Sequence, residues 1–172
     1  MIILRPATFN DHTAIARLHS ESWKNNYRGI WSDDFLDNKV DADRLSVWLH
    51  RLKSAGEEQH TVVAVLDQVI VGFVCVFLNE DPVFGSLVDN LHVRSDLQNS
   101  GIGRMLLVNS AEWINNNSDL KKMYLWVYNV NRNARAFYER LGGIHFETIE
   151  KSNDDGTSAL CCRYVWKDTR IF

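Results

Sequence analysis

The chain of 172 residues has few cysteines. It contains three cysteines, Cys75, Cys161 and Cys162, and all of them lie in apolar, strand-like runs. An odd number of cysteines, two of them adjacent, suits neither a disulfide framework nor a zinc site. We therefore expect buried, reduced thiols and no bound metal.

The sequence also lacks a long apolar run. The longest, Val69 to Leu78, has ten residues, whereas a membrane-spanning helix needs roughly 18 or more. Arg5 and Pro6 stand where a secretory signal would continue its apolar segment. The net charge of −3 argues against bulk binding of nucleic acid or anionic membranes. These features predict a cytoplasmic protein that binds neither nucleic acid nor membrane.

No internal repeat, low-complexity tract or linker rich in proline or serine divides the chain. A chain of this length can bury a sizeable core as one unit. Its hydrophobic fraction of 45% and charged fraction of 24% are typical of globular proteins. We therefore predict a single domain that spans residues 1–172.

Hydrophobic periodicity predicts a sheet flanked by helices. "IILRPAT" is expected to be a strand, followed by a helix that Asn10 or Asp11 can cap. Between residues 22 and 41 the irregular spacing of apolar residues predicts short helices and a loop, and "DADRLSVWLHRLKSA" restores a helical period. Two β-branched runs that meet at Asp67-Gln68 predict a hairpin. Further strands and helices give the order β-α-α-β-β-β-α-β-α-β-β, which predicts an α/β (α+β) fold with a single mixed sheet and helices on both faces.

The stretch "LQNSGIGRMLL", residues 97 to 107, places two glycines directly before a helix. Glycine is used where the backbone curls tightly or where a ligand approaches closely. The first turn of a helix leaves N–H groups without partners, and the helix dipole makes that end locally positive. The stretch is thus a candidate anion or phosphate cradle, and a turn that merely starts a helix is the alternative. It has neither the G-x-G-x-x-G of a dinucleotide turn nor the G-K-[ST] of a P-loop.

The neighbourhood of this stretch narrows the choice. Gln98-x-x-Gly101-x-Gly103, after a strand ending "LHV" and before a helix, resembles the pyrophosphate loop of the GNAT-type N-acetyltransferases. "LWVYNVNRNARAFYERLGGIHFE" resembles the second signature of that family, and the strand order matches its fold over essentially the whole chain. The resemblance implies a mostly antiparallel sheet of about seven strands. It also implies an enzyme that transfers acetyl from acetyl-CoA to a primary amine of a small molecule, peptide or protein.

The resemblance assigns residues to acetyl-CoA. In this family a β-bulge separates the strand equivalent to "DNLHV" from "LWV" and frees backbone groups for the pantetheine arm. The diphosphate is expected on the N–H groups of residues 99–104. Asn131 matches an asparagine beside the pantetheine, although a helix N-cap is a compatible role. The residues expected to bind the cofactor are Leu91, His92, Val93, Gln98, Asn99, Ser100, Gly101, Ile102, Gly103, Arg104, Asn131, Ala134 and Phe137.

The same resemblance implies the catalytic groups. Tyr138 matches a tyrosine that lies near the thioester sulfur, and a phenol with a pKa of about 10 can protonate the leaving thiolate at neutral pH. Many relatives carry a glutamate near the start of the bulged strand as the base, but Leu87 occupies that position here. We take Asp89 as the general base, with His92 and Glu21 as the alternatives.

The acceptor cleft is expected within "ESWKNNYRGIWSDDFL". Trp23, Tyr27 and Trp31 are the predicted substrate-binding residues, and core packing is the alternative role for their side chains. The mild net acidity of the chain weakly favours a cationic acceptor, and a homodimer would be common in this family. A CoA-binding sensor that has lost catalysis is the alternative function. A third reading, a protein that binds ATP or NAD, conflicts with the absent lysine and third glycine.

Overall fold

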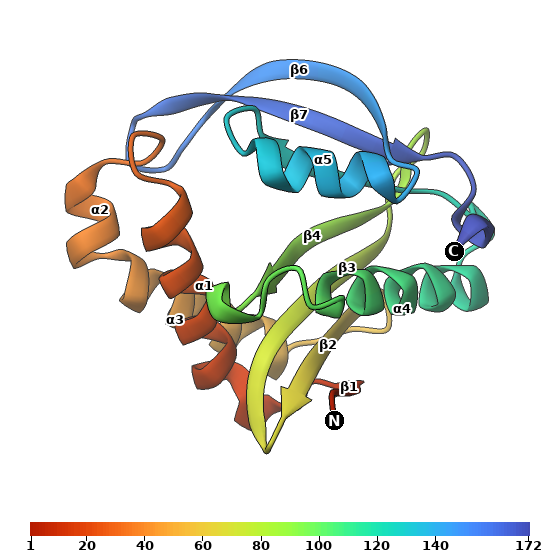
Figure 1. Ribbon diagram of the computed structural model, residues 1–172, viewed down its shortest axis with the longest axis horizontal. Coiled ribbons are helices and arrows are strands. Elements are labelled where there is room, and N and C mark those ends of the chain that lie inside the picture. Colours follow the sequence, from red (N-terminus) through yellow and green to blue (C-terminus); the bar gives the residue numbers. More distant parts are fainter.

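A seven-stranded sheet with helices on both faces organises the computed structural model, which describes residues 1–172 (Figure 1). The strands follow the order β1-β2-β3-β4-β5-β7-β6, and only the β4–β5 pair is parallel. The predicted mixed, mostly antiparallel sheet is therefore confirmed. The strands are β1 (Ile3–Pro6), β2 (Gln59–Leu66), β3 (Val69–Asp81), β4 (Gly85–Val93), β5 (Met123–Tyr128), β6 (Ile144–Ser152) and β7 (Ser158–Trp166).

Three helices precede β2, whereas the predicted order had two. Helices α1 to α3 pack on one face of the sheet, and α4 and α5 cover the other. Alternation along β3 explains this arrangement, because Phe73 and Cys75 face the α1 and α3 side while Val74 and Val76 face α4. None of the helices is long and apolar enough to span a membrane. The helices are α1 (His12–Asn26), α2 (Asp33–Asn38), α3 (Val40–Lys53), α4 (Ile102–Asn117) and α5 (Arg132–Arg140).

The β2–β3 hairpin and the start of α1 can be compared with the sequence predictions. Asp67 and Gln68 have φ values of 49° and 66°, so the β2–β3 hairpin turns where the sequence predicted it. Asp11 stands at the N-cap of α1 but makes no side-chain cap hydrogen bond to that helix. Its carboxylate instead accepts two hydrogen bonds of 2.8 Å from Arg5, and this pairing lowers the pKa of Asp11 to about 2. Asp11 is therefore at the predicted N-cap position, but its carboxylate pairs with Arg5 of β1 and does not make the capping hydrogen bond.

The sheet opens between β4 and β5. Cys75 pairs with Asn90 and Val76 pairs with Val88, so Asp89 is an extra residue that forms a β-bulge in β4. β4 pairs with β5 only at its first residues, Ser86 and Leu87. Beyond the bulge the two strands diverge, as the resemblance implied, and the facing backbone edges are left without a partner strand.

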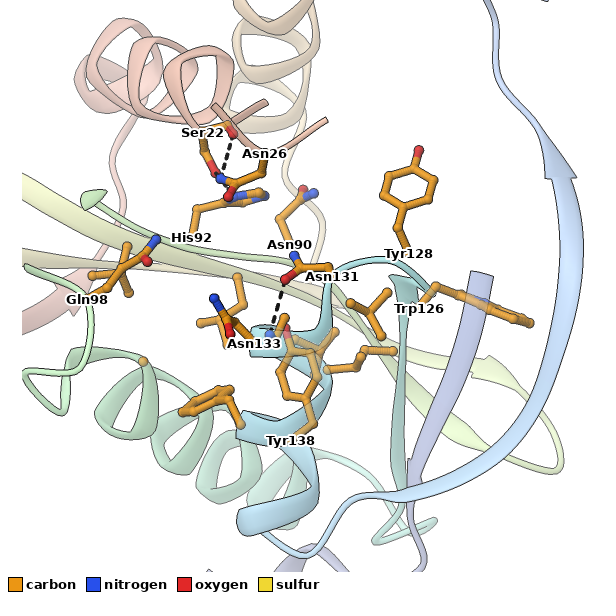
Figure 2. A pocket seen from close by; sticks show the side chains of 18 of the residues that line it. Ser22, Asn26, Asn90, His92, Gln98, Trp126, Tyr128, Asn131, Asn133 and Tyr138 are labelled. Atoms are coloured by element: carbon orange, nitrogen blue, oxygen red, sulfur yellow. Dashed lines mark hydrogen bonds between the residues drawn. The ribbon is translucent and has the colours of Figure 1, made fainter. Parts of the chain in front are cut away.

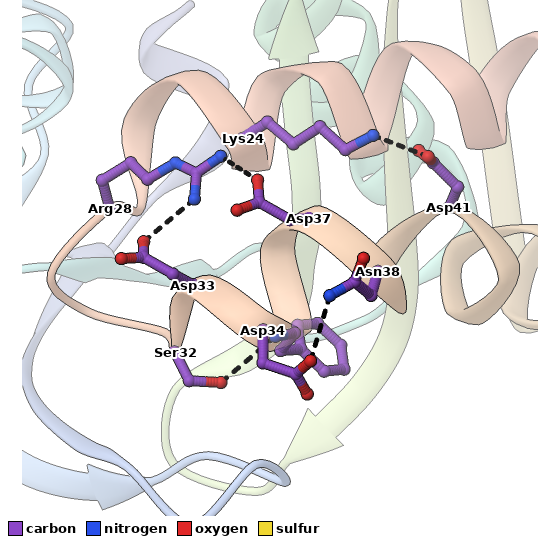
Figure 3. Close-up of polar contacts among 9 residues, drawn as sticks. Lys24, Arg28, Ser32, Asp33, Asp34, Asp37, Asn38 and Asp41 are labelled. Atoms are coloured by element: carbon purple, nitrogen blue, oxygen red, sulfur yellow. Dashed lines mark hydrogen bonds and ion pairs between the residues drawn. The ribbon is translucent and has the colours of Figure 1, made fainter.

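Ion pairs and an apolar cluster hold α2 against the end of α1 (Figure 3). Arg28 contacts both Asp33 and Asp37 of α2. Lys24 Nζ lies 2.6 Å from Asp41 Oδ2 and ties α1 to the start of α3, which follows α2 directly. Exposed pairs of this kind stabilise a fold only slightly. The buried side chains beneath them, which include Leu36, contribute the larger share, so this segment forms a defined wall beside the opening of the sheet.

Candidate active site

A cavity of about 500 Å³ lies where β4 and β5 diverge (Figure 2). Its walls come from α1, α3, β4, the start of α4 and the segment before it, β5, α5, β6 and β7. Figure 2 shows Gln98 on one side of the cavity and Trp126 and Tyr128 on the other. We call the side formed by residues 97–104 the amide end. The opposite side is the side-chain end, which is lined by Trp23, Tyr27, Arg44, Arg51, Asp89, Trp126, Tyr128 and Lys151.

Six consecutive backbone N–H groups at the amide end, those of residues 99–104, donate to no backbone carbonyl. The first hydrogen bond of α4 runs from Met105 N–H to the Gly101 carbonyl oxygen, at 3.0 Å. Asn99 and Gly101 have φ values of 63° and 89°, and this left-handed conformation curls the chain into the helix. Free amides at a helix N-terminus attract an anion, so the geometry fits the predicted cradle.

Glycine is needed at positions 101 and 103 for different structural reasons. Gly101 needs its positive φ, and a Cβ there would meet nothing within 4 Å. Gly103 lies inside the first turn of α4, where a Cβ would stand 3.2 Å from Cζ of Phe137 on α5. Gly103 therefore allows α5 to pack closely against α4, in addition to leaving the amides accessible.

The predicted cofactor residues fall largely along one side of the cavity. Leu91, His92 and Val93 line it from β4, and Asn131, Ala134 and Phe137 line it from the start of α5 and the helix itself. Asn131 caps α5, since its Oδ1 accepts a hydrogen bond of 3.2 Å from Ala134 N–H (Figure 2). Gln98, Asn99, Gly101, Gly103 and Arg104 line the amide end.

Two residues of the predicted cofactor set do not line the cavity with their side chains. Ile102 is 1% exposed and belongs to the apolar core beneath α4. Ser100 faces solvent, and its hydroxyl donates to the Leu97 carbonyl oxygen at 2.5 Å. Each of them contributes only a backbone N–H to the amide end.

Tyr138 lines the cavity from α5 and is 8% exposed. Its ring packs edge-on against Phe137 and Trp166, so the phenol is held by core residues. Burial alone raises the pKa of the hydroxyl above its ordinary value. At neutral pH the group is therefore a protonated donor that faces the opening between β4 and β5.

Asp89 lies at the bulge and lines the cavity, but its carboxylate is engaged. Arg51 Nη1 stands 2.7 Å from Asp89 Oδ2 and donates to Asn90 Oδ1 at 2.6 Å. A proton acceptor at Asp89 would therefore work beside a guanidinium. Glu21, the third candidate base, does not line the cavity and pairs with Arg17 at 2.8 Å on the outer side of α1.

Two imidazoles lie side by side under the cavity, with ring centroids 4.5 Å apart. His92 Nδ1 is 2.9 Å from Ser22 Oγ, and His19 Nδ1 accepts from Trp48 Nε1 at 3.0 Å. Burial, and then the positive charge of Arg44, lower the pKa of His92 to about 4. Burial also lowers the pKa of His19, so both rings are neutral at pH 7.

The predicted aromatic residues divide between cavity and core. Trp23 and Tyr27 line the cavity, but Trp31 does not. Trp31 is 7% exposed, packs in the cluster beneath α2, and donates from Nε1 to the Tyr128 hydroxyl at 2.9 Å. Its indole therefore positions Tyr128, which does face the cavity.

The β6–β7 turn fastens the side-chain end to the wall formed by α1 and α2. Asn153 Nδ2 donates to the Ile30 carbonyl oxygen at 3.2 Å, and Asp155 Oδ2 accepts from Ser32 N–H at 2.6 Å. Tyr128 joins the same network by donating to Asn153 Oδ1 at 3.1 Å. These bonds hold β6 and β7 over the cavity.

Several lining residues had escaped the sequence analysis. Arg44 and Arg51 are seven positions apart on α3, a spacing that places them on one helix face and could have signalled a shared role. Side chains alternate between the two faces of β5, and this alternation could likewise have indicated that Trp126 and Tyr128 lie on one face. Lys151 carries no local signal. The residues found only from the structure include Ser22, Asn26, Arg44, Arg51, Asn90, Trp126, Tyr128, Asn133, Arg140, Lys151 and Cys161.

Comparison with known proteins agrees with this geometry. The model of a family described as acetyltransferase (GNAT) matches residues 14–143. No curated protein sequence matches the chain at a significant level. Solved structures of similar fold include PaiA N-acetyltransferase from Thermoplasma acidophilum in complex with coenzyme A, with a TM-score of 0.73 and 17% identity, covering 96% of this chain and 99% of that chain. An acetyltransferase of the GNAT family from Streptococcus pneumoniae has a TM-score of 0.71 and 18% identity, with coverage of 96% and 99%.

Proposed function

The chain belongs to the acetyltransferase (GNAT) family and is an N-acetyltransferase, and from this premise we propose that it transfers acetyl from acetyl-CoA directly to a primary amine of a small molecule, peptide or protein. The observation that carries the proposal is the row of free N–H groups at residues 99–104, which opens into the same cavity as the unpaired edge of β4. The similar protein from Thermoplasma acidophilum is in complex with coenzyme A, which supports the choice of cofactor.

In this proposal the diphosphate lies on the amide end, where N–H groups and the dipole of α4 favour negative charge. Arg104 lines that end and adds a cation. The pantetheine arm extends along the open edge of β4 and pairs with backbone groups near Leu91 and Val93, as an added strand would. Asn131 and Phe137 border the arm from the side of α5.

The reaction forms one bond and breaks another at the thioester carbonyl. The neutral amine attacks the carbonyl carbon, and a backbone N–H on the unpaired edge of β4, in the range Leu91–Val93, stabilises the oxyanion. The C–S bond then breaks, and Tyr138 donates its phenolic proton to the departing sulfur. Because burial raises the pKa of Tyr138, the phenol is protonated at neutral pH and its proton is available when the thiolate forms.

Asp89 is the proposed acceptor of the amine proton, through a water molecule, because it is the only carboxylate that lines the cavity. His92 is the alternative, although its pKa of about 4 makes it a weak base at pH 7. The free, buried cysteines support the proposed cytoplasmic location. A homodimer stays a prediction.

Calorimetric titration with acetyl-CoA, with NADH and ATP as controls, is the first test. We expect acetyl-CoA alone to bind, and a panel of amines to be acetylated in its presence. Binding without turnover of any amine would favour the alternative, a CoA-binding sensor. If acetyl-CoA does not bind, both are wrong and residues 97–104 only start a helix.

A further inference from the structure

The charges that line the cavity are strongly unbalanced. Five cationic side chains face it, from Arg44, Arg51, Arg104, Arg140 and Lys151, against the single carboxylate of Asp89. This local excess is opposite in sign to the net charge of −3 of the whole chain. The mild acidity of the sequence is thus a poor guide to the charge that an acceptor meets.

The cations fall into two groups. Arg104 is part of the amide end, and Arg140 lies on α5 one turn beyond Phe137, which touches the first turn of α4. Arg44, Arg51 and Lys151 belong to the side-chain end with Asp89. Asp89 precedes Val93 by four residues of β4, or about 13 Å at about 3.3 Å per residue. Arg51, which contacts Asp89, is therefore too far along the strand to serve the diphosphate. Arg44 and Lys151 stack on Trp23 and Trp126 and make no hydrogen bond or ion pair with residues 97–104.

Within the side-chain end, Arg51 is neutralised but Arg44 keeps a free donor. Arg51 is engaged by Asp89 and Asn90, as described above. Arg44 directs Nε and Nη2 at Asp43 Oδ2, which leaves Nη1 without a hydrogen bond. Its guanidinium stacks on the indole of Trp23, 4.3 Å from the ring centroid, and only 14% of the side chain is exposed. Arg44 is thus a held, partly satisfied cation beside the cavity.

Lys151 is the second cation with spare donors. It makes no ion pair or hydrogen bond, and its Nζ lies 3.4 Å from the ring centroid of Trp126. Such a contact is a cation–π interaction, in which the face of the indole stabilises the ammonium group. The aromatic surface that would receive a cationic acceptor is therefore already covered by a lysine of this chain.

We propose that the acceptor is a small amine that also carries a carboxylate, held at the side-chain end by Arg44 Nη1 and Lys151 Nζ. Charge-assisted hydrogen bonds from these two groups fix the carboxylate, and the amine then points along the cavity toward the bulge at Asp89. A polyamine would instead face three cations and one paired carboxylate. The inference rests on the proposed function and deepens it by naming the substrate class.

The first experiment compares matched amines on the wild-type protein. Each set holds an α-amino acid, its carboxamide and its decarboxylated amine, with polyamines and aminoalkyl phosphates as further arms, and free thiol release measures initial rates. We expect kcat/KM to fall about tenfold or more when the carboxylate becomes an amide, because a charge-assisted contact is replaced by a neutral one.

Two variants locate the effect. Arg44→Gln and Lys151→Gln should each raise KM for the amino acid about tenfold. Each should also reduce the preference for the amino acid over its carboxamide by a similar factor, with the Kd of acetyl-CoA unchanged. Lys167→Gln is the matched control, because Lys167 is exposed and does not line the cavity. Thermal unfolding of each variant checks that the fold is intact.

The outcomes separate this inference from the function on which it rests. Equal or faster turnover of polyamines or carboxamides would overturn the carboxylate acceptor and leave the acetyltransferase function standing. Preference for an aminoalkyl phosphate would overturn it in favour of a phosphate. If acetyl-CoA binds to the protein but no amine is turned over, or if acetyl-CoA does not bind, the proposed function fails first.

Discussion

The two ends of the cavity obtain their polar groups from different sources. At the amide end the donors are backbone N–H groups of residues 99–104, fixed by the turn that starts α4. At the side-chain end they are the tips of Arg44, Arg51, Tyr128 and Lys151, which come from three elements. The first end depends on backbone conformation, and the second depends on which side chains the tertiary fold brings together.

Because of this difference, the two ends tolerate different amino-acid substitutions. A backbone cradle keeps its N–H groups when most side chains change, and it is damaged by anything that shifts the turn or the helix. A side-chain site loses its donor with one substitution and keeps the backbone intact. Variants at the two ends should therefore affect the cofactor and the amine separately.

Tyr138 lies between the two ends and offers the largest effect. Tyr138→Phe removes the proposed proton donor and should lower kcat about 100-fold, or about 2.7 kcal/mol of activation free energy. The Kd of acetyl-CoA and the KM of the amine should both stay within about twofold, because neither end loses a contact. Steady-state kinetics and calorimetry measure the three constants.

Tyr124→Phe is the control for that substitution, because Tyr124 is 7% exposed and does not line the cavity. If kcat of Tyr138→Phe is like that of Tyr124→Phe, the phenol is a core residue and not the general acid. A loss that appears only in acetyl-CoA affinity would assign Tyr138 to the cofactor.

Gly103→Val should act on the amide end alone. The new side chain meets Phe137, 3.2 Å from the added Cβ, and pushes the first turn of α4 out of place. We expect the Kd of acetyl-CoA to rise about tenfold in calorimetry, with the preference among amines unchanged.

Phe137→Ala, alone and combined with Gly103→Val, shows how the glycine acts. If the combined variant binds acetyl-CoA as Phe137→Ala does, Gly103→Val weakens binding because it disturbs the packing of α5 on α4. A combined variant that still binds about tenfold more weakly would mean that the glycine admits the diphosphate itself. An unchanged Kd in Gly103→Val would remove the amide end from the cofactor site.

Acidification should lower the stability of the fold through His92, which lies under the cavity. The pKa of His92 is lowered to about 4 in the folded protein, against about 6.5 when unfolded. The unfolded chain therefore binds the extra proton first, and stability falls as the pH drops from about 6.5 to about 4. Between pH 7 and pH 5 we expect His92 to contribute a loss of about 1–2 kcal/mol in the free energy of unfolding.

Urea unfolding of wild type and His92→Gln at both pH values measures this contribution. The variant should lose less stability on acidification, whereas His50→Gln, which changes an exposed histidine, should behave as wild type. Equal losses in all three proteins would show that His92 is not held neutral by its surroundings.

The same difference between the ends explains what the sequence could predict. The amide end lies within one stretch of eleven consecutive residues, "LQNSGIGRMLL". Its glycines, the start of the helix and the free N–H groups can therefore be predicted from local sequence rules. The cations of the side-chain end are separated by 107 positions between Arg44 and Lys151. Only the tertiary fold brings these cations to the same cavity, and no local sequence pattern predicts that they lie there together.

Individual residues illustrate what the sequence alone could not predict. Trp23 and Trp31 occur in the same irregular stretch, and composition gives both the same role. In the structure both pack in the cluster under α2, but only Trp23 also lines the cavity, where Arg44 stacks on its ring. Asp11 was similarly ambiguous, since a capping position and an ion pair with Arg5 require the same residue type.

The fastening of the β6–β7 turn to the end of α1 has a consequence for the order of folding. Its bonds, from Ser32 to Asp155 and from Asn153 to Ile30, join residues 123 positions apart. Contacts of such long range require most of the chain to be ordered first, because closing so large a loop costs entropy that only a formed sheet can offset. The nascent protein would thus complete the amide end early and enclose the side-chain end last.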